Sequence, residues 1–432
     1  MLRPLTMLTL CAVATSPAVA SDTWILRTDL WGNPSFSTLV IEGERGHRDA
    51  TLDGERMEVT ESATSLQLTS ATKEGAVGHF VLAKAGDAVT GTADLPDPNN
   101  ARVLARHAVS GWRVPERKGG PRTIEFQPTD YSNTWNPDRR PVLVAWPGDT
   151  IHTATVDSGG VDEHGNTRAL FGNPQTGPFF VAGAEPGDTL VVHIRRLKLN
   201  RDYADSLDDM VGRATPASLF PGAKDLGKPV RWHLDLANGR ATPEKAEGAL
   251  ANYSVPVKPM LGGMAVAPGF GMPAVSTGDT GRYGGNMDFN EVVEGNTVYL
   301  PVQQPGALLY LGDAHALQGD GETSQYALET SMDVTVTVDL VKGRSIAMPR
   351  VESPTQIMVL GQAGSLDEAL KAASGGMVQW LQQAYGLTLS QAAQVFGSAI
   401  HYTVANLAGR SVGVAARLDK ALLPAPGIRT SP

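Results

Sequence analysis

Cysteine is almost absent from the chain, since Cys11 is the single example among 432 residues. It lies in a leader, residues 1–20, that carries Arg3, an apolar run of about ten residues, and Ala18-Val19-Ala20 before Ser21. This layout is typical of a cleaved secretory signal, so we expect a periplasmic or secreted protein. Removal of the leader leaves a mature chain without cysteine, which excludes disulfides, thiolate nucleophiles and cysteine-based zinc sites.

The chain also lacks a basic patch and any apolar run of membrane-spanning length. The apolar run of the leader is too short to cross a bilayer, and no later segment is long or apolar enough. The formal net charge is −9 at pH 7. A mildly acidic chain without a basic patch does not suit nucleic acid or anionic lipid. We therefore expect no nucleic-acid partner and no membrane partner, while a homodimer stays open.

Glycine and proline are abundant, with 47 and 29 residues dispersed along the chain, as in a turn-rich β protein. Within residues 21–115, short runs that mix apolar and polar residues (37–41, 66–69 and 79–82) are separated by turn signals. We predict an N-terminal β module here, either a meander or a small barrel. Residues of catalytic type do not cluster in it.

Residues 123–425 are predicted to form a second, larger domain that is also rich in strands. The segments 142–146 and 151–157 are expected strands, and residues 333–339 alternate strictly between apolar and polar types. Residues 199–258 are polar and without clear periodicity, which is typical of an active-site wall or lid.

Helices are predicted only near the end of this domain. Ser365-Leu366-Asp367-Glu368 has the pattern of a capping box, and Gly386 is a helix stop. A second helix is expected from Ser390 onward. We expect both helices to cover one side of the sheets.

The stretch Gly312–Glu329 (GDAHALQGDGETSQYALE) concentrates acidic residues and a histidine after an apolar run. Residues two apart on a strand point to one face, so Asp313 and His315 could offer two ligands to one metal. The following Gly-Asp-Gly permits a tight turn that returns Glu322 and Glu329 toward them. The alternative interpretation is an ordinary solvated acidic turn.

Three motifs occur in a fixed order: GPFFVAGAEPGD (177–188), GGNMD (284–288) and GDAHALQGDGE (312–322), with Glu329 seven residues after Glu322. Together they resemble the acetamidase/formamidase family over roughly residues 123–345. The resemblance implies a β-rich, sandwich- or barrel-like core, a small amide as substrate and a divalent metal at the site. The module at 21–115 lies outside the resemblance.

The resemblance also implies candidate site residues. It suggests Asp313 and His315 as metal ligands and a carboxylate as the base, for which we favour Glu329. From the residues themselves we add two further ligands in the predicted strand 151–157: His152, and Asp157 at its end. The remaining candidates are Glu322 and Asp288 as catalytic residues, and Asn286, Gly285 and Gly177 as substrate-binding residues.

Without cysteine, a Cys-Glu-Lys amidase scheme is impossible, and a Ser- and Gly-rich amidase signature is not found. Metal-assisted hydrolysis of a carbon–nitrogen bond is therefore the favoured function. Histidine with carboxylates fits zinc, while a carboxylate-rich set would also suit calcium or manganese. Two alternatives remain: a non-enzymatic ligand-binding protein, and a related hydrolase with another substrate.

Overall fold

The computed structural model describes residues 21–44, 47–71 and 77–423. The expected leader and the last residues of the predicted second domain lie outside these residues. The chain divides into two compact units, Met1–Glu116 and Arg117–Pro432, where the sequence predicts a division between residues 115 and 123. Within the described residues, no helix combines the length and apolarity needed to cross a membrane.

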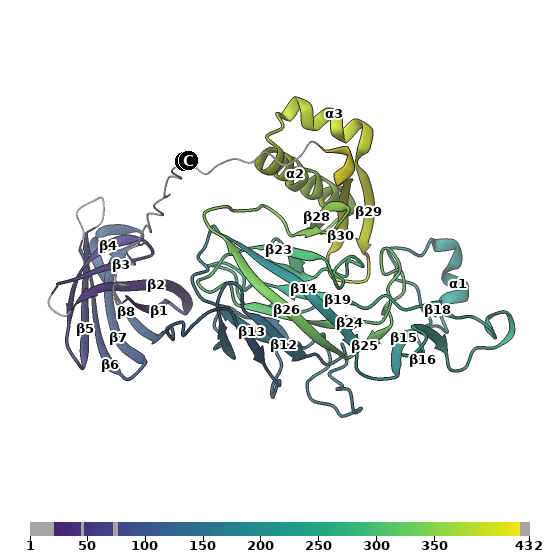
Figure 1. The fold of residues 1–432 in the computed structure, drawn as a ribbon, viewed down its shortest axis with the longest axis horizontal. Coiled ribbons are helices and arrows are strands. Elements are labelled where there is room, and N and C mark those ends of the chain that lie inside the picture. The colour runs from purple at the N-terminus through teal and green to yellow at the C-terminus, as the bar shows by residue number, and fades with distance from the viewer. Residues whose placement is uncertain (1–20, 45–46, 72–76, 424–432) are drawn as a thin grey trace, which may run out of the picture. The chain divides into compact units, whose positions relative to one another are not determined.

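The first unit is a closed barrel in which each strand pairs antiparallel with the next, and β1 with β8 (Figure 1). Its strands alternate between core and solvent, as β6 shows, with Phe80 and Leu82 inside. Trp24 and Leu26 of β1 fill the same core. The predicted all-β module is therefore confirmed as a barrel. Its strands are β1 (Ser21–Leu30), β2 (Asn33–Glu44), β3 (His47–Leu52), β4 (Glu55–Glu61), β5 (Ser65–Ala71), β6 (Val77–Ala85), β7 (Ala88–Asp97) and β8 (Asn100–Arg113).

The second unit contains two large sheets whose buried faces share one hydrophobic cluster. One sheet has the order β29-β30-β28-β27-β23-β14-β26-β12-β9. Its strands, in chain order, are β9 (Thr123–Glu125), β12 (Thr150–Ala154), β14 (Thr189–Leu199), β23 (Thr297–Pro301), β26 (Met332–Val341), β27 (Arg350–Glu352), β28 (Gln356–Ala363), β29 (His401–Asn406) and β30 (Val412–Asp419). The strand predicted at 333–339 is confirmed as the centre of β26.

The other sheet carries the motifs and has the order β18-β17-β16-β15-β25-β24-β19-β22-β21, with β13 beside β24 and β11 beside β13. A separate bridge joins β10 (Thr134–Trp135) to β20 (Val275–Ser276). The strands of the larger sheet are β11 (Leu143–Ala145), β13 (Gln175–Val181), β15 (Tyr203–Leu207), β16 (Pro229–Asp235), β17 (Arg240–Pro243), β18 (Val255–Pro256), β19 (Met260–Ala265), β21 (Thr280–Gly281), β22 (Gly284–Asn286), β24 (Leu309–His315) and β25 (Glu329–Thr330).

Residues 199–258 differ from the expected irregular wall. They contain β15 to β18 and the short helix α1 (Phe220–Ala223), and β15 pairs with β25 so that the strands extend the sheet. The prediction is wrong because these strands are only partly buried: β16 places its single fully buried residue, Leu234, among polar ones. Periodicity in the sequence is therefore weak.

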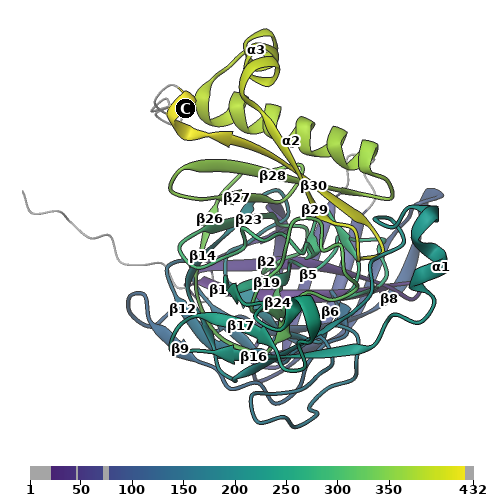
Figure 2. The ribbon, with the colours of Figure 1, turned by 90° about the vertical axis from the view of Figure 1, so that its right-hand side faces the viewer.

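The two predicted helices are confirmed, and α2 (Leu366–Tyr385) lies against β28 and β30 (Figure 2). Met377 and Leu381 of α2 join Val359 and Leu418 of these strands in one apolar cluster. The predicted capping box is wrong, because the Ser365 hydroxyl donates to its neighbour Asp367 instead of capping the backbone.

The second helix, α3 (Leu389–Ala399), begins one residue before the predicted start. Its N-terminus carries a capping box formed by Thr388 and Gln391, which was not predicted from the sequence. Strands β29 and β30 follow the helices, where no strand was predicted.

Candidate metal and active site

Asp313 and His315 lie on β24, an interior strand whose seven residues are all buried. Strands β19, β13 and β25 pair with it. His315 Nε2 lies 3.5 Å from Asp313 Oδ1. Asp313 has a φ of 55°, in the left-handed region, so β24 is locally distorted at this residue. The expected proximity of the two side chains is therefore present on an irregular strand.

Glu329 reaches the same place from the neighbouring strand β25. The antiparallel register sets Glu329 directly opposite His315, and Glu329 Oε1 lies 3.2 Å from His315 Nε2. Directly opposed residues of an antiparallel pair have neighbouring side chains. Asp313, His315 and Glu329 thus bring ligand atoms within 4.8 Å of one another.

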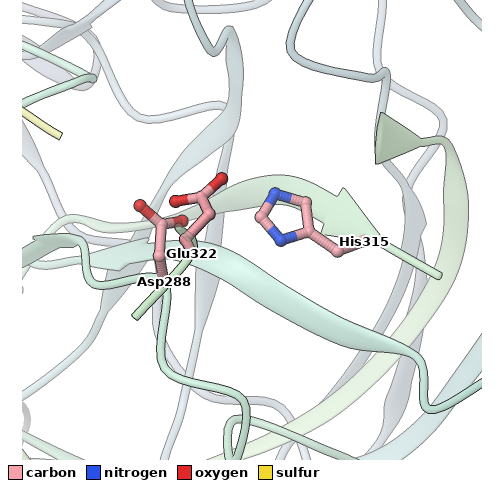
Figure 3. Close-up of side chains that lie close together, drawn as sticks. All are labelled: Asp288, His315 and Glu322. Atoms are coloured by element: carbon pink, nitrogen blue, oxygen red, sulfur yellow. The ribbon is translucent and has the colours of Figure 1, made fainter. Parts of the chain in front are cut away.

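A second set of three overlaps the first at His315. Asp288 follows β22, and Glu322 lies in the turn after Gly321; both carboxylates lie together beside the His315 ring (Figure 3). Asp288 and Glu322 have φ values of 40° and 43°. Such backbone is uncommon for residues other than glycine, and it concentrates at functional sites. Both side chains are buried.

Several polar atoms in this cluster are buried and make no well-aligned hydrogen bond among the described residues, although His315 Nε2 lies close to two carboxylates. They are Asp288 Oδ1, Asp313 Oδ1, His315 Nε2 and Glu329 Oε2. A buried, unsatisfied charged group is costly, and a bound cation is one way in which proteins satisfy it. The cluster offers four carboxylates and one imidazole, a donor set that fits a hard or borderline divalent ion.

Gly262 of β19 leaves room for this cluster. A Cβ at this position would lie 2.4 Å from Asp288 Oδ1 and 2.7 Å from Asp313 Oδ2. These contacts are shorter than real Cβ atoms show, so any larger residue would displace the carboxylates. Glycine at position 262 is therefore a requirement of the site.

Burial and mutual repulsion shift the pKa values of the cluster. Burial, and then the Asp313 charge, raise the pKa of Asp288 well above its usual value. Burial, and then Asp288, do the same to the pKa of Glu322, and burial also raises the pKa of Glu329. Burial alone would lower the pKa of His315, but the charges of Glu329 and Asp313 outweigh it and raise that pKa. A positive ion would relieve this repulsion.

A shell of amide side chains orients the cluster. Gln318 Oε1 lies 3.0 Å from His315 Nδ1, while Gln318 Nε2 donates to the Asp288 carbonyl. With its amide nitrogen used there, Gln318 accepts from Nδ1–H, which leaves Nε2 as the ligand atom. Asn173 Nδ2 donates to Asn286 Oδ1 (2.7 Å) and to Asp313 Oδ2 (3.2 Å).

Three residues of this shell were not predicted from the sequence: Asn173, Gln318 and Asn406. Gln318 lies inside the quoted GDAHALQGDGE motif, and that position could have marked it. Asn406 Nδ2 donates to Asp288 Oδ2 from β29, beyond both helices. No feature of the sequence places Asn406 near the motifs.

His152 lies away from the cluster, which corrects its expected placement. Ile151 and Thr153 occupy the buried face of β12, so His152 turns outward with its side chain 44% exposed. Its Nδ1 lies 2.5 Å from Glu125 on the adjacent strand β9. Because His152 lies on the exposed face of β12, it does not reach the cluster.

Asp157 is buried but has its own partner. Arg201 Nη2 donates to Asp157 Oδ2 at 2.7 Å, and the Val161 N–H donates to Asp157 Oδ1 at 2.8 Å. Arg201 also donates to the backbone carbonyl of Glu329, at 3.3 Å. Asp157 therefore supports β25 indirectly and is not among the residues that group around His315.

The proposed substrate-binding residues divide into two kinds. Asn286 lines a cavity of about 270 Å³ that also exposes Asp313, Glu322 and Glu329. Gly177 and Gly285 have structural reasons to be glycine, because a Cβ would lie 2.7 Å from Leu309 O and 2.3 Å from Asp279 O, respectively. We assign no substrate contact to these two glycines.

The chain is similar to known amidases over this unit. The sequence profile of the Acetamidase/Formamidase family matches residues 121–399. A putative formamidase of Schizosaccharomyces pombe is 27% identical over 50% of this chain and 65% of its own length. The chain thus spans just under two thirds of that relative.

Two solved structures share the fold. The acetamidase of Yersinia enterocolitica is 28% identical, with a TM-score of 0.62, over 70% of this chain and 94% of that one. A protein described as a predicted acetamidase/formamidase from Thermoanaerobacter tengcongensis is 26% identical, with a TM-score of 0.59, over 70% and 97%. The fold and the family motifs agree, and the chain belongs to the acetamidase/formamidase family.

Proposed function

We propose that this chain is a metal-dependent hydrolase that cleaves the carbon–nitrogen bond of a small carboxamide, giving an acid and ammonia. The observation that carries the proposal is the set of buried, unsatisfied donor atoms beside a cavity lined by Asp313, Glu322 and Glu329. Family membership and the names of the relatives, formamidase and acetamidase, support the same reaction.

We assign the metal to Asp313, His315 and Glu329, with Asp288 as a further oxygen donor. Each of these residues contributes one of the unsatisfied buried atoms. Zinc is the first candidate for a site with an imidazole, and calcium or manganese is the next because carboxylates predominate. When bound, a divalent ion at this position supplies Lewis acidity to the amide carbonyl and to the water molecule that attacks it.

Glu322 is the residue that we assign to proton transfer, in place of Glu329. Glu322 lines the cavity, and Ala327 N–H holds its Oε1 at 3.3 Å. Water adds to the carbonyl carbon, and the carbon–nitrogen bond breaks once the nitrogen has gained a proton. Glu322 takes the proton from water and delivers it to the leaving nitrogen, while the side-chain amide of Asn286 orients the substrate.

Ammonia release from formamide and acetamide tests this proposal. Activity is expected to disappear with a chelator and to return with the metal that elemental analysis finds in the purified protein. Glu322→Gln should lower kcat by about a hundredfold or more and retain the metal. The matched control is Glu368→Gln, at an exposed position of α2, which should leave both unchanged. Full amide turnover by chelated, metal-free protein would contradict the metal assignment.

We also propose that the protein is exported, because residues 1–20 have the layout of a cleaved signal. Expression of the full chain in a Gram-negative host should yield a mature protein that begins at Ser21 in the periplasmic fraction. Cytoplasmic retention of a chain that still carries residues 1–20 would contradict the proposal.

A further inference from the structure

The cavity beside the metal ligands is larger than a formamide or acetamide molecule requires. Its volume is about 270 Å³. A water molecule takes about 30 Å³ of liquid, so an amide of three or four heavy atoms fills roughly 100 Å³. Small-molecule pockets usually begin at about 300 Å³, so a cavity of this size suits a compact ligand. The cavity therefore has room for a further group of the substrate beside the carboxamide.

Two aromatic side chains form part of the wall of this cavity. Phe171 and Tyr326 both line the cavity, and their rings meet edge to face with centroids 6.3 Å apart. Phe171 is 68% exposed, which is unusual for a large apolar side chain beside a polar site. An aromatic or compact apolar group that enters the cavity would cover this ring, and removal of both apolar surfaces from water would favour binding.

The loop that carries Phe171 is held in place by hydrogen bonds. Asn133 Nδ2 donates to the carbonyls of Leu170 and Gly172, at 3.0 and 3.1 Å. The Thr277 hydroxyl donates to Gly172 O at 2.9 Å. The next residue, Asn173, contacts Asp313 directly. The aromatic wall is thus built into the same framework as the metal ligands, as in a preorganised binding site.

Among the described residues that line the cavity, the one cationic side chain is Arg410, and it already has an acidic partner. Its guanidinium is paired with Asp279, with Nη1 3.3 Å from Oδ2. Gly278 and Gly409 also line the cavity and contribute no side chain to it. Because three carboxylates also line the cavity, a neutral aromatic substituent suits it better than a carboxylate.

We propose that the substrate is a primary amide of an aromatic or compact apolar acid, with benzamide as the simplest example. The carboxamide would lie at the carboxylates, and the ring would lie against Phe171 and Tyr326. Benzamide has nine heavy atoms, which by the same scaling occupy roughly 250 Å³ and so nearly fill the cavity. This inference rests on the proposed amide hydrolysis at the same site.

The test compares kcat/KM for acetamide and benzamide in the full chain. Wild type should prefer benzamide by about tenfold or more, and Phe171→Ala should remove about tenfold of kcat/KM for benzamide with less than a twofold effect on acetamide. Leu170→Ala is the matched control, since Leu170 is the preceding residue and is 79% exposed. Its kinetics should equal those of wild type.

A binding measurement separates this inference from the proposed function. Calorimetric titration of benzamide into Glu322→Gln protein should show binding that weakens about tenfold when Phe171→Ala is added. Turnover of acetamide with no preference for benzamide, or an equal loss for both amides in Phe171→Ala, would overturn the aromatic wall and leave amide hydrolysis intact. Phe171-dependent binding of benzamide without turnover of any amide would instead overturn the proposed reaction.

Discussion

At the scale of single residues, Gly262 offers the most direct test of the site. Gly262→Ala places a methyl group where two carboxylate oxygens lie, at 2.4 and 2.7 Å. We expect this variant to lose most of its bound metal and its amide hydrolysis. Metal content per chain and ammonia release would be measured together.

The control for Gly262→Ala is Gly375→Ala, in the middle of α2, where a Cβ meets no atom within 4 Å. Alanine favours a helix over glycine by about 1 kcal/mol, so this control should retain the metal and gain slightly in stability. A Gly262→Ala protein that retains metal at the wild-type level would show that the ion does not lie between Asp288 and Asp313.

The proximity of ligand-type side chains was predictable from the sequence where the residues lie close together in the chain. Asp313 and His315 are two residues apart on one strand, and the turn at Gly321 explains the return of Glu322. Asn406 could not be predicted, because a strand that follows two helices brings it to Asp288. Asn406 was a site residue that was missed, whereas His152 was predicted and lies elsewhere. A ligand-type residue in an alternating strand need not face the core.

At the scale of secondary structure, the buried pair of Arg201 and Asp157 supports the strand that carries Glu329. The side chain of Arg201 is 1% exposed and donates to Asp157, to the Glu329 carbonyl and to Thr330 Oγ1 (3.2 Å). Asp157→Ala leaves a buried charge without its partner, which typically costs about 3–5 kcal/mol. We expect a loss of this size in the free energy of unfolding, measured by urea denaturation, together with weaker metal binding.

The comparison for this variant is Lys371→Ala on α2, which breaks an exposed pair with Glu368. Exposed pairs contribute about 0–1 kcal/mol, so this change should be small. An Asp157→Ala protein as stable as Lys371→Ala would mean that water or a rearranged side chain satisfies Arg201. In that case β25 would not depend on the buried pair.

Burial on both faces explains why some elements were missed. Residues 412–416 of β30 are all buried, because α2 covers one side and the sheet core lies on the other. Such a strand has no apolar–polar alternation to detect. Strands β15 to β18 were missed for other reasons. Few residues of β16 to β18 are buried, and the buried residues of β15, Ala204 and Ser206, are small or polar. Apolar–polar alternation in the sequence predicts a strand best when one face is buried and the other is exposed, as in β26.

At the scale of the whole molecule, the chain separates its chemistry from its barrel. All the residues assigned to metal binding and proton transfer belong to the second unit, while the first unit has its own hydrophobic core. The composition and turn signals of residues 21–115 were enough to predict a β module, because its strands alternate regularly. Barrel closure through β1 and β8 was not predictable, since it depends on pairing between the two ends of the module.

The barrel contains an acid-sensitive ion pair whose effect on stability can be measured. Burial alone would raise the pKa of Asp22, but a hydrogen bond from Arg48 and the charge of Arg113 outweigh it and hold this pKa below its usual 3.8. A carboxyl group with a lowered folded-state pKa stabilises the fold fully above pH 3.8. That contribution is lost as the pH falls from 3.8 through the folded-state value.

Asp22→Asn should therefore destabilise the barrel at pH 7 by about 1 kcal/mol, a value that allows for partial solvent screening of the pair. The deficit should shrink steadily below pH 3.8, where the wild-type carboxyl group is also neutral. Differential scanning calorimetry of the full chain would follow the barrel transition, identified as the one whose midpoint temperature the core substitution Val89→Ala lowers.

The matched control is Asp49→Asn, because Asp49 pairs with Arg56 while both side chains are largely exposed. A deficit for Asp22→Asn that is equal at pH 7 and pH 3 would show that the asparagine side chain, and not the lost charge, causes the destabilisation.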